Sequence, residues 1–268
     1  MNIFVLKILA LCFMVLDHLN MYMPDIFPIE FRWIGRMAAP IFIFCLVQGM
    51  IHTSARKKYI IRLYAASVVL GIEEIILMNI FPNSQQPLMN SMFATLFIIG
   101  VFIYIINSGL SVKKKIIAFV GFILTQTIIG YIITILFIPI NQLNTLSQSS
   151  LIEYTSKCEC ITNFLPNFIY CDGGFQWIIL GVGMYLFRSN KKKLTIMYCL
   201  YSLFEFTSTA LIGMTMSNLF FVNYQWIMII TVPFLLLYNG EKGKGLKFLF
   251  YIFYPLHIGV IFILSNII

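Results

Sequence analysis

Residues 4–22 read FVLKILALCFMVLDHLNMY, an apolar run that is long enough to cross a membrane as one helix. A cleaved signal peptide has a basic start and an apolar core without ionisable residues. Here Lys7 is the single basic residue near the start, and Asp17 and His18 interrupt the apolar core. We therefore expect this segment to remain in the mature protein as a transmembrane helix.

The rest of the chain has the same apolar character. Of its 268 residues, 60% are hydrophobic and 10% are charged, whereas an ordinary soluble domain is about half apolar and about a quarter charged. One globular core of this length cannot hide so many apolar side chains. The composition excludes a soluble enzyme, a disordered scaffold and a disulfide-stapled secreted domain. At ~20 residues per span plus a loop, it predicts an all-α membrane bundle with about nine transmembrane helices.

Apolar runs separated by polar clusters place these spans. They lie near residues 4–22, 37–52, 59–80, 88–107, 115–138, 174–187, 194–213, 218–238 and 248–267.

Every second loop between the spans is basic, and the loops at 81–87 and 214–217 carry no charge. Cytoplasmic loops collect Lys and Arg, so this alternation predicts a cell-membrane protein with a cytoplasmic N-terminus and an external C-terminus. It also explains the net charge of +8 without nucleic acid as a partner. The basic residues of these loops are Arg56, Lys57, Lys58, Arg62, Lys113, Lys114, Lys115, Arg188, Lys191, Lys192, Lys193, Lys242, Lys244 and Lys247.

The segment at about 139–173 is the longest predicted loop, and it is expected outside the cytoplasm. It contains Cys158, Cys160 and Cys171. This spacing lacks the paired cysteines of a zinc site, so no metal is expected. Either one disulfide joins Cys158 or Cys160 to Cys171 on the oxidising side, or all three are free thiols.

Ionisable residues inside the spans are candidates for a functional site, because a charge near the bilayer centre costs at least ~2.5–3.5 kcal/mol. Adjacent helical residues point about 100° apart, so Asp17 and His18 need partners on other helices. Arg36 is the natural counter-ion for Asp17 or for a glutamate. The candidates are Asp17, His18, Arg36, Glu73, Glu74, Glu205 and His257.

These residue types suit acyl transfer. A neutral His18 or His257 could take a proton from an attacking amine or hydroxyl, and Arg36 could stabilise the resulting oxyanion. The same residues would also suit a proton-coupled transporter. Two structural interpretations remain open as well: Asp17 and Arg36 as a clamp between helices, and His257 as a donor to a carbonyl that Pro255 frees.

Several motifs resemble the TraX family of membrane acyltransferases, whose founding member acetylates the N-terminus of conjugative pilin. The most specific is IGRMAAPIFIF, which looks like a Gly-Arg-x-x-x-Pro-x-Phe signature. The matching segments are MVLDH at 14–18, IGRMAAPIFIF at 34–44, KYIIRL at 58–63, NSMFATL at 90–96 and YIFYPLH at 251–257.

The resemblance implies a single domain over residues 1–268 that moves an acetyl or similar short acyl group from acetyl-CoA to a peptide or an envelope sugar. It places the catalytic residues at Asp17, His18, Arg36 and His257. In this interpretation His18 is the general base held by Asp17 or a glutamate, Arg36 binds the carbonyl oxygen, and His257 is a second base or binds the acceptor.

The basic loops at 56–62, 113–115 and 188–193 are candidates to bind the CoA phosphates. We assign this site to Arg56, Lys57, Lys58 and Arg62. In the family, acetyl-CoA comes from the cytoplasm, whereas the predicted topology places Asp17, His18 and Arg36 toward the outer face.

Two alternatives to an acyltransferase remain: a proton-coupled transporter or flippase, and a non-catalytic membrane assembly partner.

Overall fold

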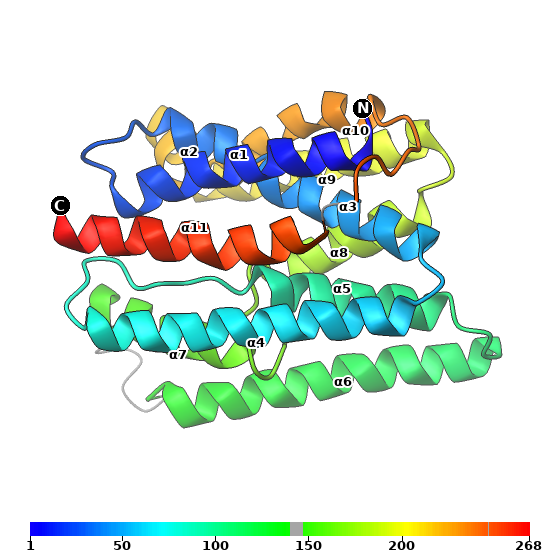
Figure 1. The fold of residues 1–268 in the computed structure, drawn as a ribbon, viewed down its shortest axis with the longest axis horizontal. Coiled ribbons are helices and arrows are strands. Elements are labelled where there is room, and N and C mark those ends of the chain that lie inside the picture. Colours follow the sequence, from blue (N-terminus) through cyan, green and yellow to red (C-terminus); the bar gives the residue numbers. More distant parts are fainter. Residues whose placement is uncertain (140–146, 246) are drawn as a thin grey trace. The chain divides into compact units, whose positions relative to one another are not determined.

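In the computed structural model, residues 1–139, 147–245 and 247–268 are described, and their regular elements are all helices (Figure 1). Eight of the nine predicted spans coincide with one α-helix each. These helices are α1 (Ile3–Tyr22), α3 (Ala38–His52), α4 (Arg56–Ile80), α5 (Met92–Ile106), α6 (Val112–Phe137), α8 (Gly174–Leu186), α9 (Lys191–Ile212) and α11 (Lys247–Ile267).

The all-helical membrane fold is confirmed, whereas the count of nine crossings stays a prediction. Five helices in the described ranges are long and apolar enough to cross a membrane: Ile3–Tyr22, Glu30–His52, Val112–Phe137, Lys191–Ile212 and Leu249–Ile267. Three further apolar helices are shorter: Met92–Ile106, Gly174–Leu186 and Gln225–Leu236.

The predicted span at 218–238 is interrupted. It consists of a π-helix, η2 (Asn218–Val222), a 3₁₀-helix, η3 (Gln225–Thr231), and a short α-helix, α10 (Val232–Leu236). Pro233 lies in the first turn of α10, where its missing N–H costs no helical hydrogen bond. Irregular helical turns of this kind are frequent at functional sites.

The chain forms two compact units. The first consists of Met1–Gln48 and Gly183–Ile268, and the second consists of Gly49–Val182. A compact unit is not by itself an independently folding domain, so the single domain over residues 1–268 stays a prediction.

In the first unit, α1 and α11 lie side by side and run in the same direction (Figure 1). The start of α1 is tied to the loop before α11, because the backbone N–H of Ile3 donates to the carbonyl of Glu241 (2.9 Å) and that of Phe4 to the carbonyl of Lys242 (3.2 Å). The N-terminus and this basic loop therefore lie at the same end of the unit. The predicted topology requires this, since it assigns both to the cytoplasm.

In the second unit, the segment expected to be a long loop contains a helix, α7 (Gln148–Thr162). The Ser147 hydroxyl caps this helix by accepting from the backbone N–H of Ser150. Gly71 on α4 makes room for the end of α7, because a Cβ at this position would lie 2.8 Å from Cβ of Asn163. Residues 140–146 of the predicted loop lie outside the described ranges.

The three cysteines of this segment are free thiols, so the disulfide alternative is not realised. Cys158 and Cys171 are buried, and Cys160 is half-buried. Burial raises the pKa of the Cys160 and Cys171 thiols to about 12. Because the thiolate is the reactive form, these two thiols are chemically inert at neutral pH.

A buried polar network holds α7 in place. Oε1 of Glu159 accepts from the Ser91 hydroxyl (2.9 Å), whose oxygen accepts from the backbone N–H of Asp172 (2.7 Å). Asn163 donates to Oε2 of Glu74 (3.3 Å) and to the carbonyl of Asn90 (3.0 Å). Burial, together with the Asp172 carboxylate, raises the pKa of Glu159 to about 8.

The network predicts a pH-dependent stability. Glu159 keeps its proton in the folded protein between its ordinary pKa of 4.5 and about 8, whereas the unfolded chain loses it there. The free energy of unfolding should fall across this window by up to about 1.4 kcal/mol per pH unit. Thermal unfolding from pH 5 to 8 should give a shallower pH dependence for Glu159→Gln than for the wild type. The exposed Glu153 on the same helix is the matched control, and equal slopes for Glu159→Gln and Glu153→Gln would contradict the prediction.

Candidate functional site

Two histidines from opposite ends of the chain meet in the first unit. Nδ1 of His18 on α1 lies 2.8 Å from Nε2 of His257 on α11, and their rings are stacked with centroids 5.0 Å apart. Both side chains are buried. On its other side, Nδ1 of His257 lies 3.0 Å from the carbonyl oxygen of Phe253.

These contacts assign the proton positions in the neutral pair. A carbonyl oxygen accepts hydrogen bonds, so Nδ1 of His257 carries a proton and donates to Phe253. In a neutral imidazole the other nitrogen is then an acceptor, so Nε2 of His257 accepts from Nδ1–H of His18. Nε2 of His18 is left with a lone pair. The pair therefore presents one basic nitrogen, and it belongs to His18.

His257 does not have the role that the proline suggested. Pro255 lacks an N–H, so the carbonyl it would free is that of Tyr251, four residues earlier. The His257 side chain instead contacts the carbonyl of Phe253, and its ring stacks on the Phe253 ring at 5.4 Å. These contacts fix the orientation of the His257 ring.

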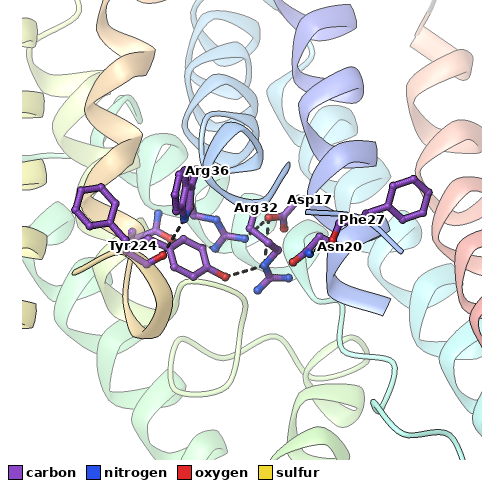
Figure 2. Close-up of polar contacts among 9 residues, drawn as sticks. Asp17, Asn20, Phe27, Arg32, Arg36 and Tyr224 are labelled. Carbon is purple, nitrogen blue, oxygen red and sulfur yellow. Dashed lines mark hydrogen bonds and ion pairs between the residues drawn. The ribbon is translucent and has the colours of Figure 1, made fainter. Parts of the chain in front are cut away.

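Asp17 is paired with arginines from the segment that follows α1. Nη2 of Arg36 donates to Oδ1 of Asp17 (2.5 Å), and Nε of Arg32 lies 3.7 Å from the same oxygen (Figure 2). Arg32 belongs to α2 (Glu30–Gly35), and Arg36 is its C-cap. Gly35 allows this close approach, because a Cβ there would lie 2.6 Å from Oδ1 of Asp17.

The interrupted span completes this centre. The Tyr224 hydroxyl accepts from Nε of Arg32 (2.8 Å), and Oε1 of Gln225 accepts from Nη1 of Arg36 (3.2 Å). The Tyr224 ring also lies 5.4 Å from the guanidinium of Arg36. The break between η2 and η3 brings Tyr224 to the arginines (Figure 2), and Gln225 is the residue that follows it.

The structure brings the four predicted catalytic residues together as two neighbouring pairs, because Asp17 and His18 are adjacent in α1. One expectation is wrong, namely that Asp17 or a glutamate holds His18. His18 contacts His257 instead, and Asp17 is paired with Arg36 and Arg32. Glu74 contacts Asn163 rather than Arg36. Glu205 is buried on α9, as expected for a residue within a span.

Arg32, Tyr224 and Gln225 were missed by sequence reasoning. Arg32 carried a usable signal, because it precedes Arg36 by one helical turn and therefore faces the same side. Tyr224 and Gln225 carried none, since the predicted span at 218–238 contains no charge and the break in it was not expected.

The four residues assigned to CoA phosphates lie in the second unit. Arg56 is half-buried, and its Nε donates to the carbonyl of Met50 (2.9 Å). Lys57, Lys58 and Arg62 are exposed, so their charges are available to a soluble ligand. In the described part of the chain, no group of three or more His, Cys, Asp or Glu side chains could hold a metal ion.

Together these features define a polytopic helical membrane protein with a buried centre of ionisable side chains. The TraX protein family model matches residues 3–172 and 160–265 of the chain. The chain therefore belongs to the TraX family, as its motifs had indicated. Comparison with curated proteins and with solved structures gives no match.

The Asp17 pairing predicts a large effect on stability. Asp17→Asn removes the carboxylate and leaves two arginine side chains buried without a counter-charge, which should cost about 3–5 kcal/mol of unfolding free energy. Thermal unfolding of the purified protein measures it. Asp25→Asn, at an exposed position in the following turn, is the matched control and should stay within about 0.5 kcal/mol of the wild type. A similar small change for Asp17→Asn would contradict a paired, buried carboxylate.

Proposed function

We propose that the chain is an integral membrane acyltransferase. It would move an acetyl or similar short acyl group from a CoA thioester to an amine or hydroxyl of a peptide or envelope sugar. The observation that carries this proposal is the orientation of the histidine pair, which leaves Nε2 of His18 as its basic nitrogen. His18 is adjacent in α1 to Asp17, which binds the arginines. The segments that resemble TraX motifs contain all four residues, and the chain belongs to that family, which supports the proposal.

The proposed reaction uses the basic nitrogen directly. The acceptor nitrogen or oxygen attacks the acyl carbon, and its proton passes to Nε2 of His18. The negative charge that develops on the acyl oxygen is stabilised by the arginine centre. The carbon–sulfur bond then breaks, and the imidazolium returns the proton to the leaving thiolate. The acceptor is left acylated and the cofactor is left as its thiol.

His257 acts in this scheme as a positioning residue. It accepts from Nδ1–H of His18, which keeps the lone pair of His18 on Nε2, and its own ring is fixed by the Phe253 carbonyl. When His18 takes a proton, the imidazolium keeps Nδ1–H and its bond to His257. The pair therefore keeps its geometry throughout the transfer.

Acetyl-CoA is the proposed donor. Its phosphates would bind the exposed charges of Lys57, Lys58 and Arg62 together with the half-buried Arg56 at the start of α4. Phosphate recognition of this kind raises affinity without changing the chemical step. Lys57→Glu with Lys58→Glu should therefore raise KM for acetyl-CoA by about tenfold or more and leave kcat unchanged. Steady-state kinetics at several acetyl-CoA concentrations measure both constants, and a loss confined to kcat would contradict this assignment.

The alternative is a proton-coupled transporter or flippase. The interrupted span at 218–238 favours it specifically, because transporters commonly build substrate sites from discontinuous helices. In that case the histidines and Asp17 would carry protons, and the thioester would not react.

Thioester turnover by the purified protein separates the two functions. With acetyl-CoA and a mixture of peptide amines, His18→Gln should lower turnover by about 10²–10⁴-fold, because it removes the general base. His257→Gln should lower it less, since His18 keeps its base. The third histidine, His52, lies exposed at the end of α3, and His52→Gln is the matched control. Wild-type turnover that none of these changes affects would exclude the proposed base, and no acetyl-CoA binding by folded protein would favour the transporter.

A further inference from the structure

We propose that Arg32, through Nη1, binds an anionic oxygen in the Asp17 centre. The inference rests on the proposed function for the identity of that oxygen, but not for the existence of the site. Resemblance and spacing had pointed to Arg36 for this role. The contacts of the two arginines point to Arg32 instead.

The charges of the centre do not cancel. Asp17 contributes one negative charge, and Arg32 and Arg36 contribute two positive charges within reach of the same carboxylate oxygen. The histidine pair cannot offset this charge, because an imidazole is either neutral or positive. The centre thus carries one uncompensated positive charge. Its side chains are largely buried, because Asp17 exposes 14% of its side-chain surface and each arginine exposes 19%. An anion is the ligand that such a site favours.

Both terminal nitrogens of Arg36 have protein partners. One of its terminal nitrogens donates to Asp17 at 2.5 Å and the other to Gln225 at 3.2 Å. Its guanidinium also faces the Tyr224 ring. These contacts make Arg36 the structural counter-ion of Asp17.

One guanidinium nitrogen of Arg32 is available to a ligand. Its Nε donates to the Tyr224 hydroxyl and lies near Asp17, whereas Nη1 is buried and has no hydrogen-bond partner within the described residues. In Figure 2 the far end of the Arg32 guanidinium extends beyond the dashed contacts to Asp17 and Tyr224. A buried charged donor without an acceptor is costly, so proteins retain one where a ligand supplies the acceptor.

Two ligands offer the same chemistry. The acyl oxygen becomes an oxyanion during transfer from the thioester, and a bound substrate can carry a carboxylate or phosphate oxygen in its ground state. Both present an anionic oxygen to a guanidinium N–H. The kinetic constants distinguish them, because the oxyanion exists only in the transition state.

The first experiment uses inorganic phosphate as the probe and needs no turnover. The thermal midpoint of the purified protein is measured in sodium phosphate and in sodium chloride of equal ionic strength. We expect phosphate to raise the midpoint of the wild type, Arg32→Gln to abolish the rise, and Arg188→Gln to retain it. Arg188 is a matched arginine of the same unit, where it stacks on Tyr185. A phosphate rise that persists in Arg32→Gln would overturn the site.

Arg32→Gln should fold, because it leaves Asp17 and Arg36 as a balanced pair. Arg32→Lys is the second variant, since it keeps the charge but lacks the spare fork nitrogen. In acyl transfer, a 10-fold or greater loss of kcat at unchanged KM in Arg32→Lys identifies the transition-state oxyanion as the anion that Arg32 binds. A 10-fold or greater rise of KM at unchanged kcat identifies a carboxylate or phosphate of the bound substrate instead.

The two experiments separate the site from the proposed function. If phosphate raises the thermal midpoint in an Arg32-dependent way but the protein shows no acyl transfer, the anion site is supported and the proposed acyltransferase function is rejected. Active protein in which Arg32→Lys and Arg32→Gln change neither kinetic constant, and in which phosphate gives no shift, overturns the anion site and leaves the acyltransferase.

Discussion

The contact between Asp17 and the two arginines is the constraint on which the first unit depends. A carboxylate in an apolar helix has to find a counter-charge, and α1 contains none within reach on its own face. The chain therefore turns back after α1, and α2 returns Arg32 and Arg36 to Asp17. Gly35 permits the approach, since a larger residue would displace the carboxylate.

The same contact explains why the predicted span at 218–238 is broken. Adjacent residues of a regular helix point about 100° apart, whereas the side chains of Tyr224 and Gln225 both reach the arginines. Tyr224 lies in the break between η2 and η3, and Gln225 begins η3. The indole N–H of Trp33 also donates to the carbonyl of Phe220 (2.8 Å), so α2 and η2 are joined a second time. The interrupted span and α2 thus hold each other in place: the span supplies acceptors to the arginines, and Trp33 donates to a carbonyl of the span.

Sequence reasoning succeeded where one physical rule decides the outcome. Hydropathy over about 20 residues places a helix regardless of its neighbours, so eight of the nine predicted segments coincide with one α-helix each. The helical angle between adjacent residues separated the partners of Asp17 and His18, and the structure gives them Arg36 and His257. It failed where the outcome depends on distant contacts. Helix α7 has too few apolar residues to be noticed as a span, and it is held by polar contacts such as that between Glu159 and Ser91.

The depth of the centre sets a requirement for any cytoplasmic donor. Asp17 is 14 residues from the start of α1 at Ile3, which is about 21 Å along the helix axis at ~1.5 Å per residue. If α1 begins at the cytoplasmic face, as the basic loops predict, the centre lies beyond the middle of a hydrocarbon layer of about 30 Å. An acyl donor has to extend its thioester over that distance, whereas a proton can cross it through a chain of polar side chains. The proposed acyl transfer therefore requires an elongated donor with its charged end held in the cytoplasm, and a long flexible arm that ends in a thioester meets this requirement.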